Sequence, residues 1–172
     1  MEVIYLQFSV GVEYALHCLT YFVDIPSGTT IGTKELAKFQ GVSETYLSKI
    51  FTKLKKAGIV RSMPGVKGGY ELAKHPSQIN FWEVISAIEG KQPFFQCTNI
   101  RQKCILSEEE EYTDPSRCAP CTINVIMLEA EERMKEYLES KTIAELHETI
   151  KTKAKDKHIK GVEWFREALG RR

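Results

Sequence analysis

The sequence predicts a mainly α-helical fold with a small β-hairpin wing: a winged helix-turn-helix followed by a long dimerisation helix. Three observations support this prediction. Two short helical segments meet at a tight turn, two β-type segments flank a glycine-rich turn, and a helical period returns after residue 121. The 172 residues suffice for one domain with an appendage, and the 42% apolar and 27% charged content excludes a collagenous, wholly disordered or membrane-embedded chain.

The formal net charge is only +1, but the charges are segregated along the chain. Residues 34–74 contain nine basic and three acidic side chains, residues 107–148 contain four basic and twelve acidic ones, and residues 151–172 are basic again. A basic block within a folded region is a candidate nucleic-acid footprint, and a solvated charged face is the plainer alternative. No apolar run approaches the roughly 18 residues of a membrane span, and an N-terminus without a basic first segment is a poor export signal. We therefore expect a cytoplasmic protein with no membrane partner.

Three helices are expected in the first sixty residues. Ser9 caps the first, which runs to about Phe22, and the signature Thr33-Lys-Glu-Leu36 begins the second. Ser43 caps the third, whose apolar side chains recur at 3.6-residue spacing until Gly58 stops it. The tight turn between the second and third helices is the layout of a helix-turn-helix, whose second helix enters the major groove of DNA. A purely structural helical hairpin is the alternative.

The next segment predicts a β-hairpin wing directly behind the third helix. Residues 59–62 and 69–73 form its strands, and the turn between them is rich in glycine and contains one lysine. We expect Lys67 and Gly68 to approach the phosphates, because wings lie along the DNA backbone and glycine permits a close approach. A hairpin whose glycines serve only the turn is the alternative.

Three further helices are expected downstream of the wing. Asn80 caps the first, the helical period from Cys121 to about Glu139 marks a long second one, and Thr142 caps a short third one. The long helix either covers the core or pairs with its copy. The basic C-terminal segment is either marginally ordered or a small docking helix. The chain then divides into a DNA-binding domain at 1–90, a cysteine-bearing sensor loop at 91–121, a dimerisation helix with the following short helix at 122–150, and a basic tail at 151–172.

Four of the five cysteines lie close together in the sequence. Cys18 is expected in the core of the first helix, whereas the others fall in the loop or at the start of the long helix: Cys97, Cys104, Cys118 and Cys121. Disulfides are rare in cytosolic proteins, and four thiolates suit zinc or an iron–sulfur cluster. A metal-free thiol switch also fits. A dithiol redox enzyme using Cys118 and Cys121 would need a βαβ context that the sequence lacks.

The four histidines, at positions 17, 75, 147 and 158, have no partner at ligand spacing. Each is expected to be an ordinary surface or core residue. The sequence has no phosphate-binding loop of the Walker type and no catalytic triad whose order can be argued. It predicts no enzyme activity.

Seven segments resemble one family of regulators. Together they are similar to the Rrf-two family of bacterial winged helix-turn-helix transcriptional regulators, which includes the iron–sulfur-cluster regulator, the nitric-oxide-sensitive repressor and the repressor of cysteine metabolism. The resemblance covers roughly residues 8–147. The matching segments are Tyr14-Ala-Leu16, Leu36-Ala37, Gly41-Val-Ser-x-x-Tyr-Leu47, Leu54-x-x-Ala-Gly-Ile-Val60, Gly65-x-x-Gly-Gly-Tyr-x-Leu-Ala73, Val84-Ile-x-Ala-Ile-Glu-Gly90 and Thr142-Ile-Ala-Glu-Leu146.

The resemblance implies a homodimeric repressor bound to a pseudo-palindromic operator in double-stranded DNA. It implies base contacts from Thr45, Ser48 and Lys49, with Ser43 and Tyr46 near the DNA backbone; the outward position of Lys53 adds a phosphate contact. Two departures prevent the operator sequence from being borrowed: a basic pair of the family is replaced by Val12-Glu13, and a wing-tip arginine by Pro64. A winged helix that binds protein instead of DNA is the alternative.

The resemblance also implies how a cluster would be bound. In cluster-binding members three cysteines of this region are ligands, and they match Cys97, Cys104 and Cys121. Other members add a histidine three residues after the last cysteine, where this chain has Asn124, or an acid from the first helix, where it has Glu13. We expect Cys118 to be the fourth ligand of an iron–sulfur cluster, with structural zinc or no metal as the alternatives.

Overall fold

The computed structural model describes residues 8–26, 28–65, 68–90, 93–98 and 121–170. The chain forms two compact units, one made of residues 1–90 with 138–172 and the other of residues 91–137. Among the described residues, every helix is too short or too polar to cross a membrane.

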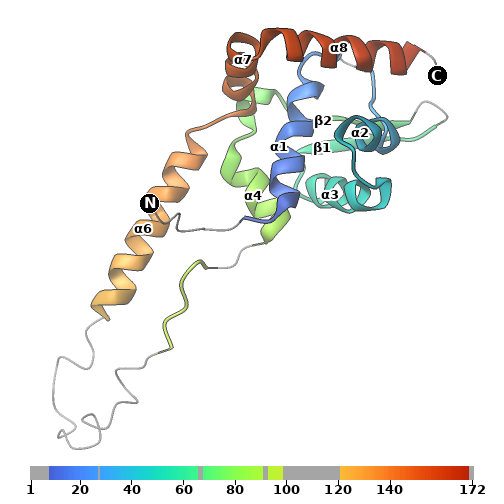
Figure 1. Ribbon diagram of the computed structural model, residues 1–172. Helices are drawn as coiled ribbons and strands as arrows, with labels where there is room; N and C mark the ends of the chain where they lie inside the picture. Colours follow the sequence, from blue (N-terminus) through green and yellow to red (C-terminus); the bar gives the residue numbers. More distant parts are fainter. Residues whose placement is uncertain (1–7, 27, 66–67, 91–92, 99–120, 171–172) are drawn as a thin grey trace, which may run out of the picture. The chain divides into compact units, whose positions relative to one another are not determined.

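The first three helices lie where they were expected, and the second and third form the helix-turn-helix (Figure 1). They are α1 (Val10–Phe22), α2 (Thr33–Gln40) and α3 (Glu44–Lys56). The turn is tight because Gly41 ends α2 in the left-handed region, at φ 68°. The next helix starts at once because the Ser43 side chain accepts a hydrogen bond of 3.2 Å from the Tyr46 N–H. Both local signals are confirmed.

The wing is an antiparallel hairpin of β1 (Val60–Met63) and β2 (Gly69–Leu72), one residue later at its start than expected. A third segment joins it, because Ile31 and Tyr70 exchange both backbone hydrogen bonds, of 2.9 and 2.8 Å. This pairing explains the second glycine of the Gly-Gly-Tyr motif. A Cβ on Gly69 would lie 2.5 Å from the carbonyl oxygen of Ile31.

We therefore expect Gly69→Ala to destabilise the fold by about 1–3 kcal/mol, the cost of forcing an extra methyl into a closed site. The contacted atoms are backbone, so they cannot rotate away as a side chain would. Urea denaturation measures the loss. Gly170→Ala is the matched control, since a Cβ there meets open space. Equal unfolding midpoints for the two variants would contradict this account of the motif.

The helix α4 (Phe81–Glu89) packs against α1 and α3. It is preceded by the short 3-10 helix η1 (Pro76–Gln78). Asn80 caps α4 as expected, accepting a hydrogen bond of 2.8 Å from the Glu83 N–H. Ser9 stands at the start of α1, but its side chain does not cap that helix. Instead its N–H and O–H donate to the Glu89 carboxylate, at 2.9 and 2.6 Å, which ties the start of α1 to the end of α4.

The C-terminal segment is more ordered than the sequence predicts. Thr142 and Glu145 form a full capping box that starts α7 (Ile143–Lys153), and α8 (Lys155–Gly170) follows almost directly. Phe165 of α8 is fully buried in the core of the first unit. Residues 151–172, expected as a marginal tail or a small docking helix, thus include a sixteen-residue helix that packs on the DNA-binding fold.

The long helix α6 (Thr122–Glu139) begins one residue after Cys121 and has no buried residue. Several of its large apolar side chains are exposed, namely Ile123, Val125, Ile126, Met127, Leu128 and Tyr137. Leu138, near its end, is half-buried against the core of the first unit. α6 is therefore a helix with an unusual amount of apolar surface in contact with solvent.

Candidate functional site

The outward face of α3 is polar and accessible. Thr45, Tyr46, Lys49 and Lys53 are exposed and Ser48 is half-buried, while Leu47, Ile50 and Leu54 fill the core beneath them. This split follows the 3.6-residue period of the helix. α3 therefore presents to solvent the side chains that the sequence assigned to DNA.

The structure gives three of these residues a second role. The Ser43 hydroxyl caps α3, as described above. The Tyr46 ring meets Tyr14 edge-on at a centroid distance of 6.0 Å, so it sits at the margin of the core with 39% of its surface exposed. The Lys53 ammonium donates to the carbonyl oxygen of Ile88 at the end of α4. A cation is favourable at a helix C-terminus, and this contact was not predicted.

Gly68 is half-buried in the turn of the wing, directly before β2, and its N–H donates to the Gly65 carbonyl at 2.8 Å. Backbone atoms fill the space beside it, because a Cβ there would meet two carbonyl oxygens at 2.7 Å. Lys67 lies outside the described residues. The backbone of the wing thus leaves no room for a side chain at Gly68, which explains the glycine without reference to DNA.

Two of the four clustered cysteines are described, Cys97 and Cys121, both half-buried in the unit of residues 91–137. Cys104 and Cys118 lie outside the described residues. The Cys121 carbonyl accepts the first helical hydrogen bond of α6, from Val125 N–H at 3.0 Å. The positive end of a helix favours a negatively charged ligand such as a thiolate. The donor chemistry of these residues therefore fits a thiophilic metal or an iron–sulfur cluster.

Cys18 behaves differently from these cysteines. It is fully buried in α1, as expected, and desolvation raises the pKa of its thiol to about 12. A hydrogen bond with Gln40 opposes this shift but does not outweigh it. Cys18 is consequently a neutral core residue at physiological pH.

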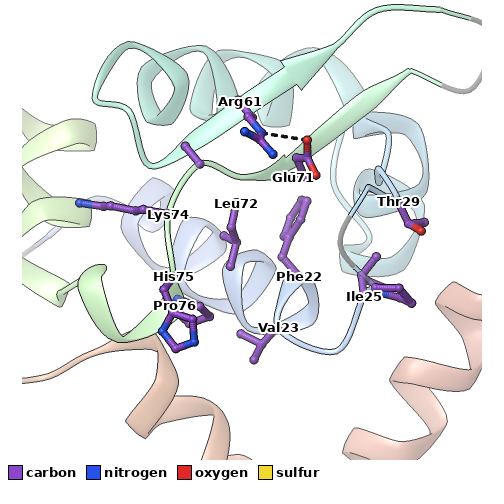
Figure 2. Close-up of a pocket in the computed structure, with 12 residues that line it drawn as sticks. Phe22, Val23, Ile25, Thr29, Arg61, Glu71, Leu72, Lys74, His75 and Pro76 are labelled. Carbon is purple, nitrogen blue, oxygen red and sulfur yellow. Dashed lines mark hydrogen bonds and ion pairs between the residues drawn. The ribbon is translucent and has the colours of Figure 1, made fainter.

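A pocket of about 410 Å³ lies between the end of α1 and the β2 strand (Figure 2). Its charged side chains are already paired: Arg61 bonds Glu71 at 2.8 Å, and Lys74 bonds Glu83 at 2.6 Å. These pairs satisfy the charges within the protein, so they give no reason to expect a charged ligand in the pocket.

The structure brings together three side chains that the sequence kept apart. Asp24 follows α1, His147 lies on α7 and His158 lies on α8, and their polar atoms all lie within 4.8 Å of one another. Both histidines are buried, as one of the two expectations had it, but the fold gives them a shared partner, Asp24, that their sequence spacing did not indicate. The sequence spacing could not have predicted this group, because His147 lies 123 positions after Asp24, and His158 lies 11 positions after His147.

The family follows from the similarity of this chain to known proteins. The model of the Rrf2 family, described as iron-dependent transcriptional regulators, matches residues 8–149. The chain belongs to the Rrf2 family.

Relatives of this Rrf2 protein agree with the assignment. The HTH-type transcriptional regulator NsrR of Shouchella clausii is 27% identical over 142 residues, which cover 82% of this chain and 88% of NsrR. Among solved structures, the global cysteine regulator CymR of B. subtilis has a TM-score of 0.61 at 23% identity, covering 84% of this chain and 98% of CymR. IscR of T. potens has a TM-score of 0.55 at 24% identity, covering 84% of this chain and 88% of IscR.

Membership of the Rrf2 family decides between the classes of function that the sequence left open. The family and the relatives are transcriptional regulators, so this Rrf2 protein is a DNA-binding regulator and not a dithiol enzyme. The predicted winged helix-turn-helix fold is also confirmed by the two solved structures.

Proposed function

We propose that this protein is a homodimeric cytoplasmic repressor that binds a pseudo-palindromic operator and whose DNA affinity depends on a cysteine-ligated iron–sulfur cluster. The observation that supports DNA reading best is the accessible polar face of α3, next to a core-filling apolar face. A helix of this kind fits the major groove, where side chains reach base edges. Thr45, Ser48 and Lys49 are the proposed base contacts, and Ser43, Tyr46, Lys53, Lys67 and Gly68 the proposed backbone contacts.

The proposed dimer is supported by the apolar surface of α6. Ile126 is 58% exposed and Met127 39% exposed. Pairing α6 with its copy would remove these side chains from water and would bring two α3 helices into one assembly, as an operator with two half-sites requires. We expect Ile126, Met127, Met134 and Leu138 at this seam, but Leu138 already contacts the core of its own chain. The contribution of Leu138 to the seam is therefore the smallest we expect.

The proposed cluster is supported by the iron-dependence in the family description and by the chemistry of the donors. Cys97, Cys104, Cys118 and Cys121 would be its ligands, and thiolates are the usual ligands of iron–sulfur clusters. When bound, the cluster supplies sensitivity to oxygen, nitric oxide or iron supply. The same thiols could hold structural zinc or act as a switch without metal.

The experiment that tests DNA reading compares two lysines on α3. Lys49→Ala should weaken operator binding by about 1–3 kcal/mol while affecting non-specific DNA less, because it removes a base contact. Lys53→Ala should weaken both kinds of binding about equally and lower the salt slope by about one charge. Fluorescence anisotropy over a salt series measures the operator affinity, the non-specific affinity and the salt slope of each variant.

Lys53→Ala needs a fold control because Lys53 also bonds the end of α4. Its melting temperature should be compared with that of Lys56→Ala, an exposed lysine at the end of the same helix. If neither Lys49→Ala nor Lys53→Ala changes operator affinity, α3 is not the reading helix and the proposal fails.

A further inference from the structure

Asp24, which follows α1, His147 of α7 and His158 of α8 form a largely buried polar group. Figure 1 shows α7 and α8 near the C-terminal end of α1. The Nε2 atoms of both histidines approach the same Asp24 oxygen, Oδ2, at 2.8 Å for His147 and 2.9 Å for His158. The histidine side chains are only 5% and 7% exposed, whereas Asp24 is 21% exposed. Three donor atoms thus converge on one point that solvent reaches from the side of Asp24.

The donors are those that a divalent transition metal prefers. Imidazole nitrogen and carboxylate oxygen both bind zinc, and zinc bonds of about 2.0–2.1 Å place tetrahedral ligand atoms about 3.3 Å apart. The two histidine–aspartate distances are shorter than this by about half an ångström, so small side-chain movements would admit an ion. Water would complete the coordination from the open side of Asp24.

The surroundings of His147 also fit a metal site. Its other ring nitrogen, Nδ1, faces the Glu148 carboxylate at 3.5 Å. Metal-binding histidines commonly donate their second N–H to a carboxylate, which fixes the orientation of the ring. The ring of His158 lies parallel to Tyr21, with centroids 6.5 Å apart.

The group stands where α8 docks on the helix-turn-helix. Beyond His158, Trp164 and Phe165 of α8 contact the Phe39 ring of α2 at centroid distances of 5.1 and 4.8 Å. Gly161 lies between, so close to the Tyr21 ring that a Cβ would meet it at 2.8 Å. A metal bound to residues from three segments would therefore fasten α7 and α8 to the DNA-binding fold.

We propose that Asp24, His147 and His158 bind a divalent transition metal of the zinc class, separate from the cysteine region, and that this ion secures α8 against α2. The proposal does not depend on the cysteines or on DNA binding. It names a second metal site whose role is to couple the C-terminal helices to the helix-turn-helix.

The test uses the full chain with Cys97, Cys104, Cys118 and Cys121 replaced by serine, so that zinc cannot bind there. After removal of metal, Zn²⁺ titration should show one equivalent bound and a melting temperature raised by about 5–10 °C at 100-fold excess over Kd.

His158→Gln in this background should weaken zinc binding more than about 100-fold, since loss of a residue that only hydrogen-bonds a metal ligand already lowers metal affinity by about 10–100-fold. Glu148→Gln should cost about tenfold. Co²⁺ in place of zinc should give the visible absorption of a tetrahedral site with nitrogen and oxygen ligands.

His17→Gln is the matched control, because His17 is an exposed histidine outside the group, and it should leave zinc binding unchanged. The glutamine side chain introduced by His158→Gln can still donate a hydrogen bond to Asp24. Circular dichroism shows whether this variant is folded, and Asp24→Asn is the second variant if it is not. No zinc uptake at micromolar free metal, or equal uptake by the His158→Gln and His17→Gln proteins, would overturn the proposal. Neither result would bear on the cysteine-ligated cluster.

Discussion

Ile126→Glu is expected to convert the protein from a dimer to a monomer. In the proposed dimer each copy of α6 covers the other, so the substitution places a carboxylate from each chain in the same apolar seam. A buried charge without a partner costs about 3–5 kcal/mol, and two-fold symmetry repeats the cost in the partner chain. The dimer should dissociate at least about 100-fold more readily. Light scattering across a concentration series measures the change.

Operator binding should fall with the dimer. Two linked helix-turn-helix units bind two half-sites with an advantage of about 10²–10⁴ over one unit. A monomer keeps only the contacts of one α3 helix, so its operator affinity should fall by a similar factor at protein concentrations where the wild type is dimeric.

Leu128→Glu is the matched control for this variant. Leu128 is 48% exposed on α6, close to the 58% of Ile126, but two positions along a helix point to opposite sides. The same acidic side chain at 128 should leave the dimer intact. If both variants remain dimeric, α6 is not the seam. A wild-type protein that is monomeric at micromolar concentration would remove the basis for a two-fold operator.

The sequence predicted those elements whose signals are local. Ser43, Asn80 and Thr142 cap their helices as expected, because a cap depends on one side chain and a backbone N–H three residues away. Gly41 ends α2 for a similarly local reason. The helix-turn-helix and the wing could therefore be placed to within a residue or two.

What the sequence could not predict depends on contacts between distant segments. α8 has a mixed, basic sequence, and its order comes from burying Phe165 against α1 and α2. The approach of His147 and His158 to Asp24 follows from that same docking. Lys53 was assigned to DNA from its outward position, and its bond to Ile88 required knowing where α4 ends.

Cys118→Ser is expected to reduce the iron and sulfide content of protein prepared without oxygen. The family pattern accounts for Cys97, Cys104 and Cys121 but not for Cys118, whose position three residues before Cys121 allows both to bind one cluster. Loss of one of four thiolate ligands should leave a cluster that is incomplete or easily lost. Iron and sulfide analysis, together with the visible spectrum, measures the loss.

Cys18→Ser is the control for this variant, because it removes a thiol that is not a proposed cluster ligand. Cys18 is buried with a thiol pKa of about 12, so it is neutral and we expect full iron content in this variant, whatever its stability. If Cys118→Ser retains a normal cluster, the fourth ligand lies elsewhere, and Glu13, exposed on α1, becomes the next residue to replace. If the wild type prepared with ample iron contains neither iron nor zinc, the cysteine region binds no metal. Oxidants should then alter DNA binding in the wild type but not in a Cys118→Ser, Cys121→Ser double variant. The reason is that the thiol switch of this alternative is the oxidation of Cys118 and Cys121 to a disulfide, which the double variant cannot form.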